Sequence, residues 1–219
     1  MRVLAIAATW AAALTAPCPG VANRLPGTQA ATQLVTVTAS AYGTTTASLE
    51  LWQRRGGCWR QIAGPWRAWL GRSGLSTHKR EGDGATPAGT YRLGATDYGI
   101  APDPGVQGAY RRLVCGDWWD EDVRSPAYNT FRHVACGTQP AFGGDSEALW
   151  RISPQYRYFA VVEYNTRPAV SGRGSAIFVH VSAGRPTAGC VSLPEAELVH
   201  LLRWLRPSAR PLISLGVSG

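Results

Sequence analysis

Lysine is almost absent from this chain, because Lys79 is the only one and arginine supplies the rest of the positive charge. The formal net charge is +8, yet no run of basic residues occurs anywhere in the sequence. Dispersed arginines without a basic run are poor evidence for a nucleic-acid-binding surface. We therefore expect no nucleic-acid partner, and the positive charge instead suits an anionic cell envelope.

Charged residues as a whole are also scarce, at 16% of the chain, while hydrophobic residues make up 45%. This balance excludes a largely disordered protein, which would combine low hydrophobicity with high charge. The 219 residues contain no internal repeat and no low-complexity tract. One large domain or two small ones fit this length, and we predict one.

Long apolar runs are missing beyond the N-terminus. Met1-Arg2 precedes a mostly apolar stretch at 3–14, the pattern of a secretory signal that is too short to span a bilayer. We predict a signal peptide over 1–22, with Ala16 as the alternative cleavage site to Ala22. The mature protein would then have no membrane span and would be secreted or held in the cell envelope, in the periplasm or cell wall. Lipidation at Cys18 is disfavoured because Pro17 stands where a lipobox has a small residue.

Five cysteines suit an oxidising compartment, and cleavage at residue 22 would leave four of them. Cys115 and Cys136 bracket one irregular segment, so we predict that they pair. Closing a loop of about twenty residues contributes roughly 3 kcal/mol in the chain-entropy model. Cys58 then has no obvious partner. It is either buried as a small hydrophobic residue or bridged to Cys190, and that bridge would remove the one remaining thiol.

Segments of alternating and β-branched residues predict a mostly β, sandwich-like domain over 33–219. A small, polar, flexible lead at 23–32 precedes it. Expected strands cover 33–40, 47–54, 58–70, a segment that begins at 90, 158–164, 175–181 and 211–215. Residues 97–150 are rich in Gly, Pro, Asp and Trp, and predict a long irregular insertion that carries the Cys115–Cys136 staple.

One main helix is expected near the C-terminus. Ser192 and Glu195 have the spacing of a capping box, and Pro207 marks the end of the helix. Four leucines between them repeat at helical spacing and predict a buried stripe. Cys190 would then lie about one residue before the helix, where the helix dipole would lower the pKa of its thiol modestly.

A histidine and a cysteine supply the candidate chemistry. His180 closes an apolar run, and Thr187-Ala188-Gly189-Cys190 follows ten residues later. A cysteine attacks carbonyl groups as the thiolate, so it needs an adjacent base, and His180 is the nearest candidate. The intervening loop contains glycine and proline and is short enough to fold back. The competing interpretation is a buried structural cysteine beside a core histidine.

Neighbouring residues would complete such a site. Gly189 would let the backbone approach a substrate closely, and the amide of Cys190 with a neighbouring amide would form an oxyanion hole. We assign the loop residues Thr187 and Ala188 to this oxyanion and substrate-binding region. The carbonyl group of Val181 is a candidate for orienting the imidazole ring of His180.

Two motifs together resemble the L,D-transpeptidase catalytic domain, the YkuD family. They are GSAIFVHV with PTAGCVSLP, and upstream KREGDGATPAGTYRL with its glycines at 82 and 89. The resemblance covers roughly residues 33–216. It implies an acyl transfer on peptidoglycan stem peptides without metal or cofactor, with Cys190 as nucleophile and His180 as base and then acid. It also implies acylation by carbapenems.

Three positions depart from the family pattern. Ala188 stands where a histidine is common, Ser192 stands where an arginine often follows, and the separation between His180 and Cys190 is shorter than usual. These departures suggest a divergent branch with a remodelled loop, on which Arg185 replaces the missing arginine in binding a carboxylate. The alternatives are an L,D-carboxypeptidase, in which water is the acceptor, and a non-catalytic wall-binding module. The sequence leaves the oligomeric state open.

Overall fold

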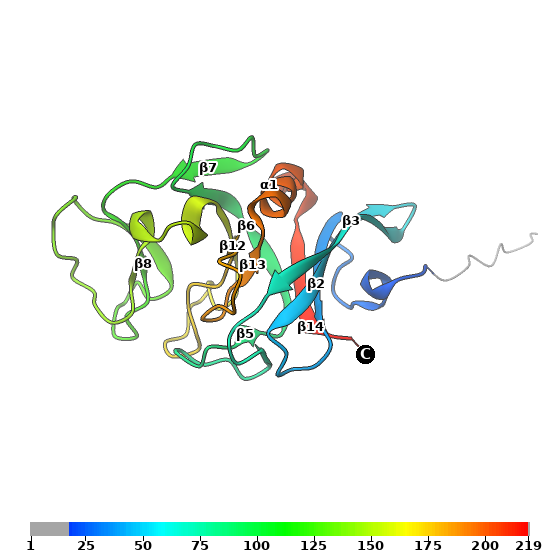
Figure 1. Ribbon diagram of the computed structural model, residues 1–219, viewed down its shortest axis with the longest axis horizontal. Coiled ribbons are helices and arrows are strands. Elements are labelled where there is room, and N and C mark those ends of the chain that lie inside the picture. Colours follow the sequence, from blue (N-terminus) through cyan, green and yellow to red (C-terminus); the bar gives the residue numbers. More distant parts are fainter. Residues whose placement is uncertain (1–17, 219) are drawn as a thin grey trace, which may run out of the picture.

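The computed structural model describes residues 18–218, so most of the predicted signal peptide lies outside the described residues. A nine-stranded sheet forms the body of the domain (Figure 1). Its strands, in spatial order, are β11 (Phe159–Val162), β12 (Phe178–Val181), β13 (Val191–Leu193), β3 (Cys58–Trp69), β2 (Thr46–Arg55), β1 (Gln33–Ala39), β14 (Leu212–Val217), β6 (Gly89–Gly99) and β7 (Ala109–Arg112).

The sheet closes on itself because β11 pairs with β12 on one side and with β6 on the other. Strands β12 and β13 run parallel, as do β1 and β14, whereas most other neighbours are antiparallel. The predicted mostly β class is confirmed, and the sandwich-like arrangement takes the form of this closed sheet. Closure leaves few free strand edges, which restricts edge-to-edge association.

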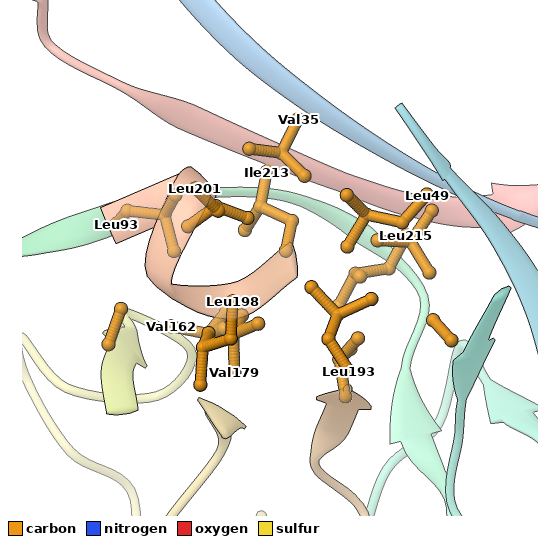
Figure 2. Packing of buried hydrophobic residues seen from close by; sticks show 14 of the residues in the cluster. Val35, Leu49, Leu93, Val162, Val179, Leu193, Leu198, Leu201, Ile213 and Leu215 are labelled. Atoms are coloured by element: carbon orange, nitrogen blue, oxygen red, sulfur yellow. The ribbon is translucent and has the colours of Figure 1, made fainter. Parts of the chain in front are cut away.

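A single α-helix, α1 (Glu195–Trp204), lies within the described residues and packs on the sheet. Three leucines of the helix are fully buried, namely Leu198, Leu201 and Leu202. Figure 2 shows Leu201 beside Ile213 of β14, and Leu198 beside Val162 of β11 and Val179 of β12. Burying each such leucine contributes about 1.5–3 kcal/mol. The predicted leucine stripe is confirmed. Short 3-10 turns occur at η1 (Val21–Arg24), η2 (Leu149–Arg151), η3 (Gln155–Arg157) and η4 (Pro207–Ala209).

The predicted capping box of this helix is wrong. Ser192 lies in β13, where it pairs with His180 of β12 and Trp69 of β3. The residue at the N-cap position is Pro194, and no side-chain hydrogen bond caps the helix there. Strand pairing therefore takes precedence over local capping, because it satisfies the backbone groups of residue 192 within a fully buried sheet.

The long insertion is more regular than its composition suggests. A three-stranded sheet is built from β8 (Asp117–Asp120), flanked by β9 (Thr130–His133) and β10 (Glu147–Ala148). The predicted Cys115–Cys136 disulfide is present, with the two Cα atoms 5.2 Å apart. Trp119 packs edge-on against Phe178 of β12, with ring centroids 4.9 Å apart. The insertion is thus fixed to the strand that carries His180. A further small pair joins β4 (Leu75–Ser76) and β5 (Thr86–Pro87).

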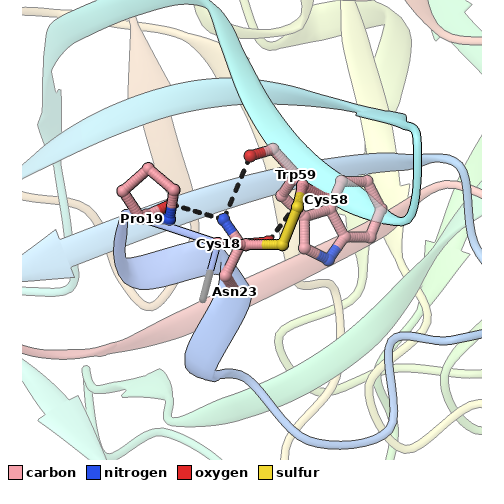
Figure 3. Close-up of a disulfide and its surroundings, with 5 residues drawn as sticks. All are labelled: Cys18, Pro19, Asn23, Cys58 and Trp59. Atoms are coloured by element: carbon pink, nitrogen blue, oxygen red, sulfur yellow. Dashed lines mark hydrogen bonds between the residues drawn. A yellow bond between two sulfur atoms is a disulfide. The ribbon is translucent and has the colours of Figure 1, made fainter. Parts of the chain in front are cut away.

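The N-terminal segment of the described chain is tied to the β2–β3 hairpin (Figure 3). Cys58 forms a disulfide with Cys18, so the expectation that it lacks a partner is wrong. Asn23 holds both backbone groups of Trp59: its Oδ1 accepts from the amide at 2.8 Å, and its Nδ2 donates to the carbonyl at 3.0 Å. The segment predicted as a flexible lead packs here, because Ala31 is buried in an apolar cluster with Trp59.

The helices in the described part of the chain are all too short, or too polar, to cross a membrane.

Candidate active site

Adjacent parallel strands position His180 and Cys190. His180 of β12 is in register with Ser192 of β13, and Cys190 is the residue directly before β13. Side chains two residues apart on a strand point to the same face, so Cys190 and Ser192 share the face that carries His180 and Phe178. The fold thus brings the two predicted residues to one side of the sheet.

A threonine fixes the turn that leads into Cys190. The hydroxyl of Thr187 donates to the carbonyl of Cys190 at 2.6 Å and accepts from the amide of Gly189 at 3.1 Å. The backbone amide of Thr187 donates to the carbonyl of Leu70 at 2.8 Å. These bonds anchor the loop to β3 and orient residue 190.

Gly189 is required by its surroundings. Its φ is +150°, and a Cβ built there would lie 2.9 Å from the carbonyl oxygen of Ala85 and 3.3 Å from a side-chain carbon of Ile177. The backbone at Gly189 therefore approaches the loop that contains Ala85, whereas its close approach to a substrate stays a prediction. That loop belongs to the upstream glycine-rich motif, so the two motifs found in the sequence meet at this point.

The imidazole of His180 is buried and held in one orientation. Its Nδ1 lies 2.8 Å from the carbonyl oxygen of Val181, the contact expected from the sequence. The ring also lies edge-on to the phenol of Tyr156, with centroids 5.7 Å apart. Burial lowers the pKa of His180 from 6.5 to about 4, although the bond to Val181 opposes this shift. The imidazole is therefore neutral at pH 7 and able to accept a proton.

Cys190 is the only cysteine outside a disulfide among the described residues, so the possible bridge to Cys58 does not form. Its side chain is 8% exposed; the thiol donates to the carbonyl of Ala176 at 3.2 Å, and the sulfur accepts from the amide of Phe178 at 3.4 Å. Burial, reinforced by the carboxylate of Glu147, raises the pKa of the Cys190 thiol well above its usual range. The resting sulfur is a neutral thiol.

The expected help from the helix dipole is absent. Strand β13 and Pro194 separate Cys190 from the first turn of α1. Dipole effects fall off within one turn of a helix end, so this helix cannot lower the pKa of the thiol.

A cavity of about 420 Å³ opens at this site. Both candidate catalytic residues line it, together with three of the loop residues predicted for substrate binding, namely His180, Cys190, Arg185, Thr187 and Ala188. Ser192 lines it as well, but its fully buried hydroxyl has no hydrogen-bond partner. The family's arginine position is thus occupied by a short side chain inside the sheet, whereas the exposed Arg185 lies at the cavity's edge.

A second cavity, of about 290 Å³, is lined by Cys190 together with residues of the insertion. Its lining includes Gly189 and three glutamates that the sequence did not mark as functional, namely Glu81, Glu121 and Glu147. Glu147 and Cys190 line both cavities. Tyr156, also unmarked, donates its hydroxyl to Glu147. The described residues contain no group of histidine, cysteine and acidic side chains arranged to hold a metal ion.

Comparison with known proteins decides the family. The model of the YkuD family, described as the L,D-transpeptidase catalytic domain, matches residues 45–213. The chain belongs to this family. The match spans the glycine-rich motif, the insertion, His180 and Cys190, so the resemblance inferred from the sequence is confirmed. The family places the chain among cell-wall enzymes of the L,D-transpeptidase type.

Two solved structures are similar to this YkuD domain, both of the helical cell shape determining protein Pgp2 from Campylobacter jejuni. A mutant form is 13% identical with a TM-score of 0.44, and the second structure is 12% identical with a TM-score of 0.40. Each alignment covers 86% of this chain and 48% of the other, so this chain spans about half the length of those proteins. No curated protein sequence matches the chain.

Proposed function

We propose that this protein is an exported L,D-transpeptidase that acts on peptidoglycan stem peptides through an acyl-enzyme on Cys190. The observation that carries the proposal is that Cys190 and His180 line one cavity inside a YkuD domain. Both residues are buried, and Cys190 is the only free thiol in the described chain. Two disulfides support an oxidising location such as the periplasm or cell wall.

The resting pair is neutral, which favours proton transfer during attack rather than before it. Since Nδ1 of His180 faces a carbonyl oxygen, it carries the hydrogen, and Nε2 is the basic nitrogen. Nε2 takes the thiol proton while sulfur bonds to the carbonyl carbon between the diamino acid's L-centre and the terminal D-residue. The tetrahedral intermediate then expels the amine of the D-residue, which leaves with that proton, and a thioester on Cys190 remains.

Backbone and arginine groups would assist this step. The amide of Gly189 already donates to Thr187, so we assign oxyanion stabilisation to the amide of Cys190. Arg185 at the cavity edge would bind the carboxylate of the terminal residue. The thioester is resolved by the amine of a second stem, with His180 again as base, or by water in an L,D-carboxypeptidase.

A second candidate function rests on the burial of the sulfur. A thiol that is 8% exposed, with a raised pKa and two hydrogen bonds to the backbone, also suits an inert wall-binding module. The two candidates differ in whether a substrate can reach the sulfur and displace these bonds.

Turnover of purified muropeptides, read by mass spectrometry, tests the proposal. A transpeptidase yields cross-linked or exchanged stems, a carboxypeptidase yields shortened stems, and a wall-binding module yields neither. Incubation with a carbapenem is the companion test: we expect one covalent adduct on the parent protein and none on Cys190→Ala. Absence of both turnover and adduct would contradict the enzymatic proposal and favour the module.

A further inference from the structure

The second cavity at Cys190, which we call the acidic chamber, is defined by Glu81, Glu121 and Glu147. These residues come from three separate parts of the chain: the glycine-rich motif, the end of β8 and strand β10. Cys190 lines both the chamber and the cavity that contains His180, so the two cavities meet at this residue. Any substrate held at the sulfur therefore has the chamber beside it.

Neutral hydroxyl groups are the hydrogen-bond donors to these carboxylates. Tyr128 and Ser175 donate to Glu81, and Tyr156 donates to Glu147. Glu121 has one oxygen near the Ser175 hydroxyl at 3.2 Å, and its other oxygen, Oε1, is buried with no partner.

Two cationic side chains, those of Lys79 and Arg72, line the chamber, and neither forms an ion pair with its glutamates. Lys79 lines it, but its ammonium is committed to Asp83 at 2.6 Å and to the carbonyl of Arg80 at 2.8 Å. Arg72 also lines it, but it is exposed and donates to the carbonyl of Gly82 at 3.3 Å. Asp145 adds a fourth carboxylate to the lining. Among the described residues, none of the chamber's carboxyl groups forms an ion pair.

The three glutamates are half-buried, and an unpaired carboxylate in such a position is costly, so the protein retains protons on them. Burial first, and then the neighbouring glutamates, raise the pKa of Glu121 to about 9. Burial likewise raises the pKa of Glu147 to about 7. A cation that entered the chamber would reverse both shifts. Because the described residues hold no metal-binding cluster, an organic ammonium group fits better than a metal ion.

We propose that the acidic chamber binds an ammonium group of the substrate that acylates Cys190, so that the protein selects stem peptides whose diamino acid keeps a free side-chain amine. The choice of stem peptides rests on the proposed function, whereas the preference of the chamber for a cation does not. Arg185 lines the cavity that contains His180 and not the chamber, so the substrate would lie with its carboxylate in that cavity and its amine in the chamber.

Charged thiol reagents test this preference without any substrate. Methanethiosulfonates transfer an RS group to the Cys190 sulfur, which forms a mixed disulfide and releases methanesulfinate. We expect the aminoethyl reagent, a cation, to modify the parent protein about tenfold faster than the neutral methyl reagent. In the double variant E121Q/E147Q the ratio should fall to about one. The control E163Q/E195Q makes the same two substitutions elsewhere and should keep the parent ratio.

Three results would overturn the proposal: a parent ratio near one, an unchanged ratio in E121Q/E147Q, or an equal loss in the control. Circular dichroism establishes that each variant is folded. If E121Q/E147Q does not fold, the salt dependence of the reagent preference in the parent protein serves as the test instead. Raising the ionic strength from about 0.02 M to about 1 M should reduce the reagent preference, and a preference that salt does not change would contradict an electrostatic origin.

A substrate comparison then separates this proposal from the proposed function. Stems with a free side-chain amine should show a kcat/KM about tenfold higher than stems acetylated at that amine, and E121Q/E147Q should remove the difference. Equal turnover of both stems would overturn the selection while leaving the enzymatic function intact. A cation preference without any turnover would support the chamber and contradict the enzyme.

Discussion

Nδ1 of His180 lies 2.8 Å from the carbonyl oxygen of Val181, the next residue of the same strand. The contact fixes the tautomer of the ring, so Nε2 is the nitrogen that accepts a proton. Replacing this base, in His180→Ala, should slow acylation of Cys190 by about 10²–10⁴-fold. Single-turnover mass spectrometry with a carbapenem measures the rate. His200→Ala, a change of an exposed histidine on α1, is the control. A loss of less than about threefold in His180→Ala would rule out the proposed base.

The buried thiol should show an unusual pH dependence of alkylation. Because the pKa of Cys190 is raised, its thiolate fraction at neutral pH is small and grows about tenfold for each pH unit. We expect iodoacetamide to modify the folded protein slowly at pH 7, with a rate that still rises beyond pH 9. The denatured chain with its disulfides intact is the control and should react faster. A plateau below pH 8 in the folded protein would instead indicate a pre-ionised thiol.

Gly189 offers a test of the packing behind the nucleophile. An alanine Cβ there would meet the carbonyl oxygen of Ala85 at 2.9 Å, in a backbone conformation with φ of +150°. We expect Gly189→Ala to lower the free energy of unfolding by about 1–3 kcal/mol and to reduce acylation of Cys190. Gly43→Ala is the control, since nothing lies within 4 Å of its added Cβ. Urea unfolding measures both, and equal stability of the two variants would contradict the packing argument.

Asp97 should make stability depend on pH. It is 6% exposed, and its Oδ1 has no hydrogen-bond partner. Burial first, and the nearby Asp103, raise its pKa from 3.8 to about 7. A raised folded pKa contributes stability that is complete below pH 4 and is lost as the pH rises through 7.

Asp97→Asn mimics the protonated side chain and cannot lose that proton. The variant and the parent should therefore have similar unfolding free energies at pH 4, whereas the variant should be more stable at pH 8 by up to about 4 kcal/mol. Urea unfolding at both values gives the difference, in which the titration of all other groups cancels. A gap that does not change with pH would show that folding does not raise the pKa of Asp97.

Periodic patterns in the sequence were sufficient to predict most elements of the main sheet and the buried face of the helix. Alternation predicted β1, β2 and β3 to within one or two residues at each end, and the leucine spacing predicted the buried face of α1. The start of that helix was not predictable from local chemistry. Ser192 has the spacing of a cap, but its backbone pairs with β12 and β3, and only the tertiary sheet reveals this.

The residues of the candidate site also fall into two groups, those that the sequence predicted and those that it did not. His180, Gly189 and Cys190 were predicted because their chemistry lies in one short stretch of sequence. The acidic chamber was not predicted, because Glu81, Glu121 and Glu147 lie far apart in the chain and follow no period. Only the folding of the insertion against β12 brings them together. The pairing of Cys58 was missed because its partner, Cys18, was assigned to the signal peptide.

The bridge between Cys18 and Cys58 restricts where the predicted signal peptide could be cut. A signal peptide cut after Ala22 would remove Cys18 and with it the bridge. A cut that keeps the bridge therefore falls upstream of Cys18, as at Ala16. A sulfur already bonded to another sulfur cannot also carry a lipid thioether. In a chain cut at Ala16, the new N-terminal residues would be held against the β2–β3 hairpin by this bridge and by the hydrogen bonds of Asn23 to Trp59.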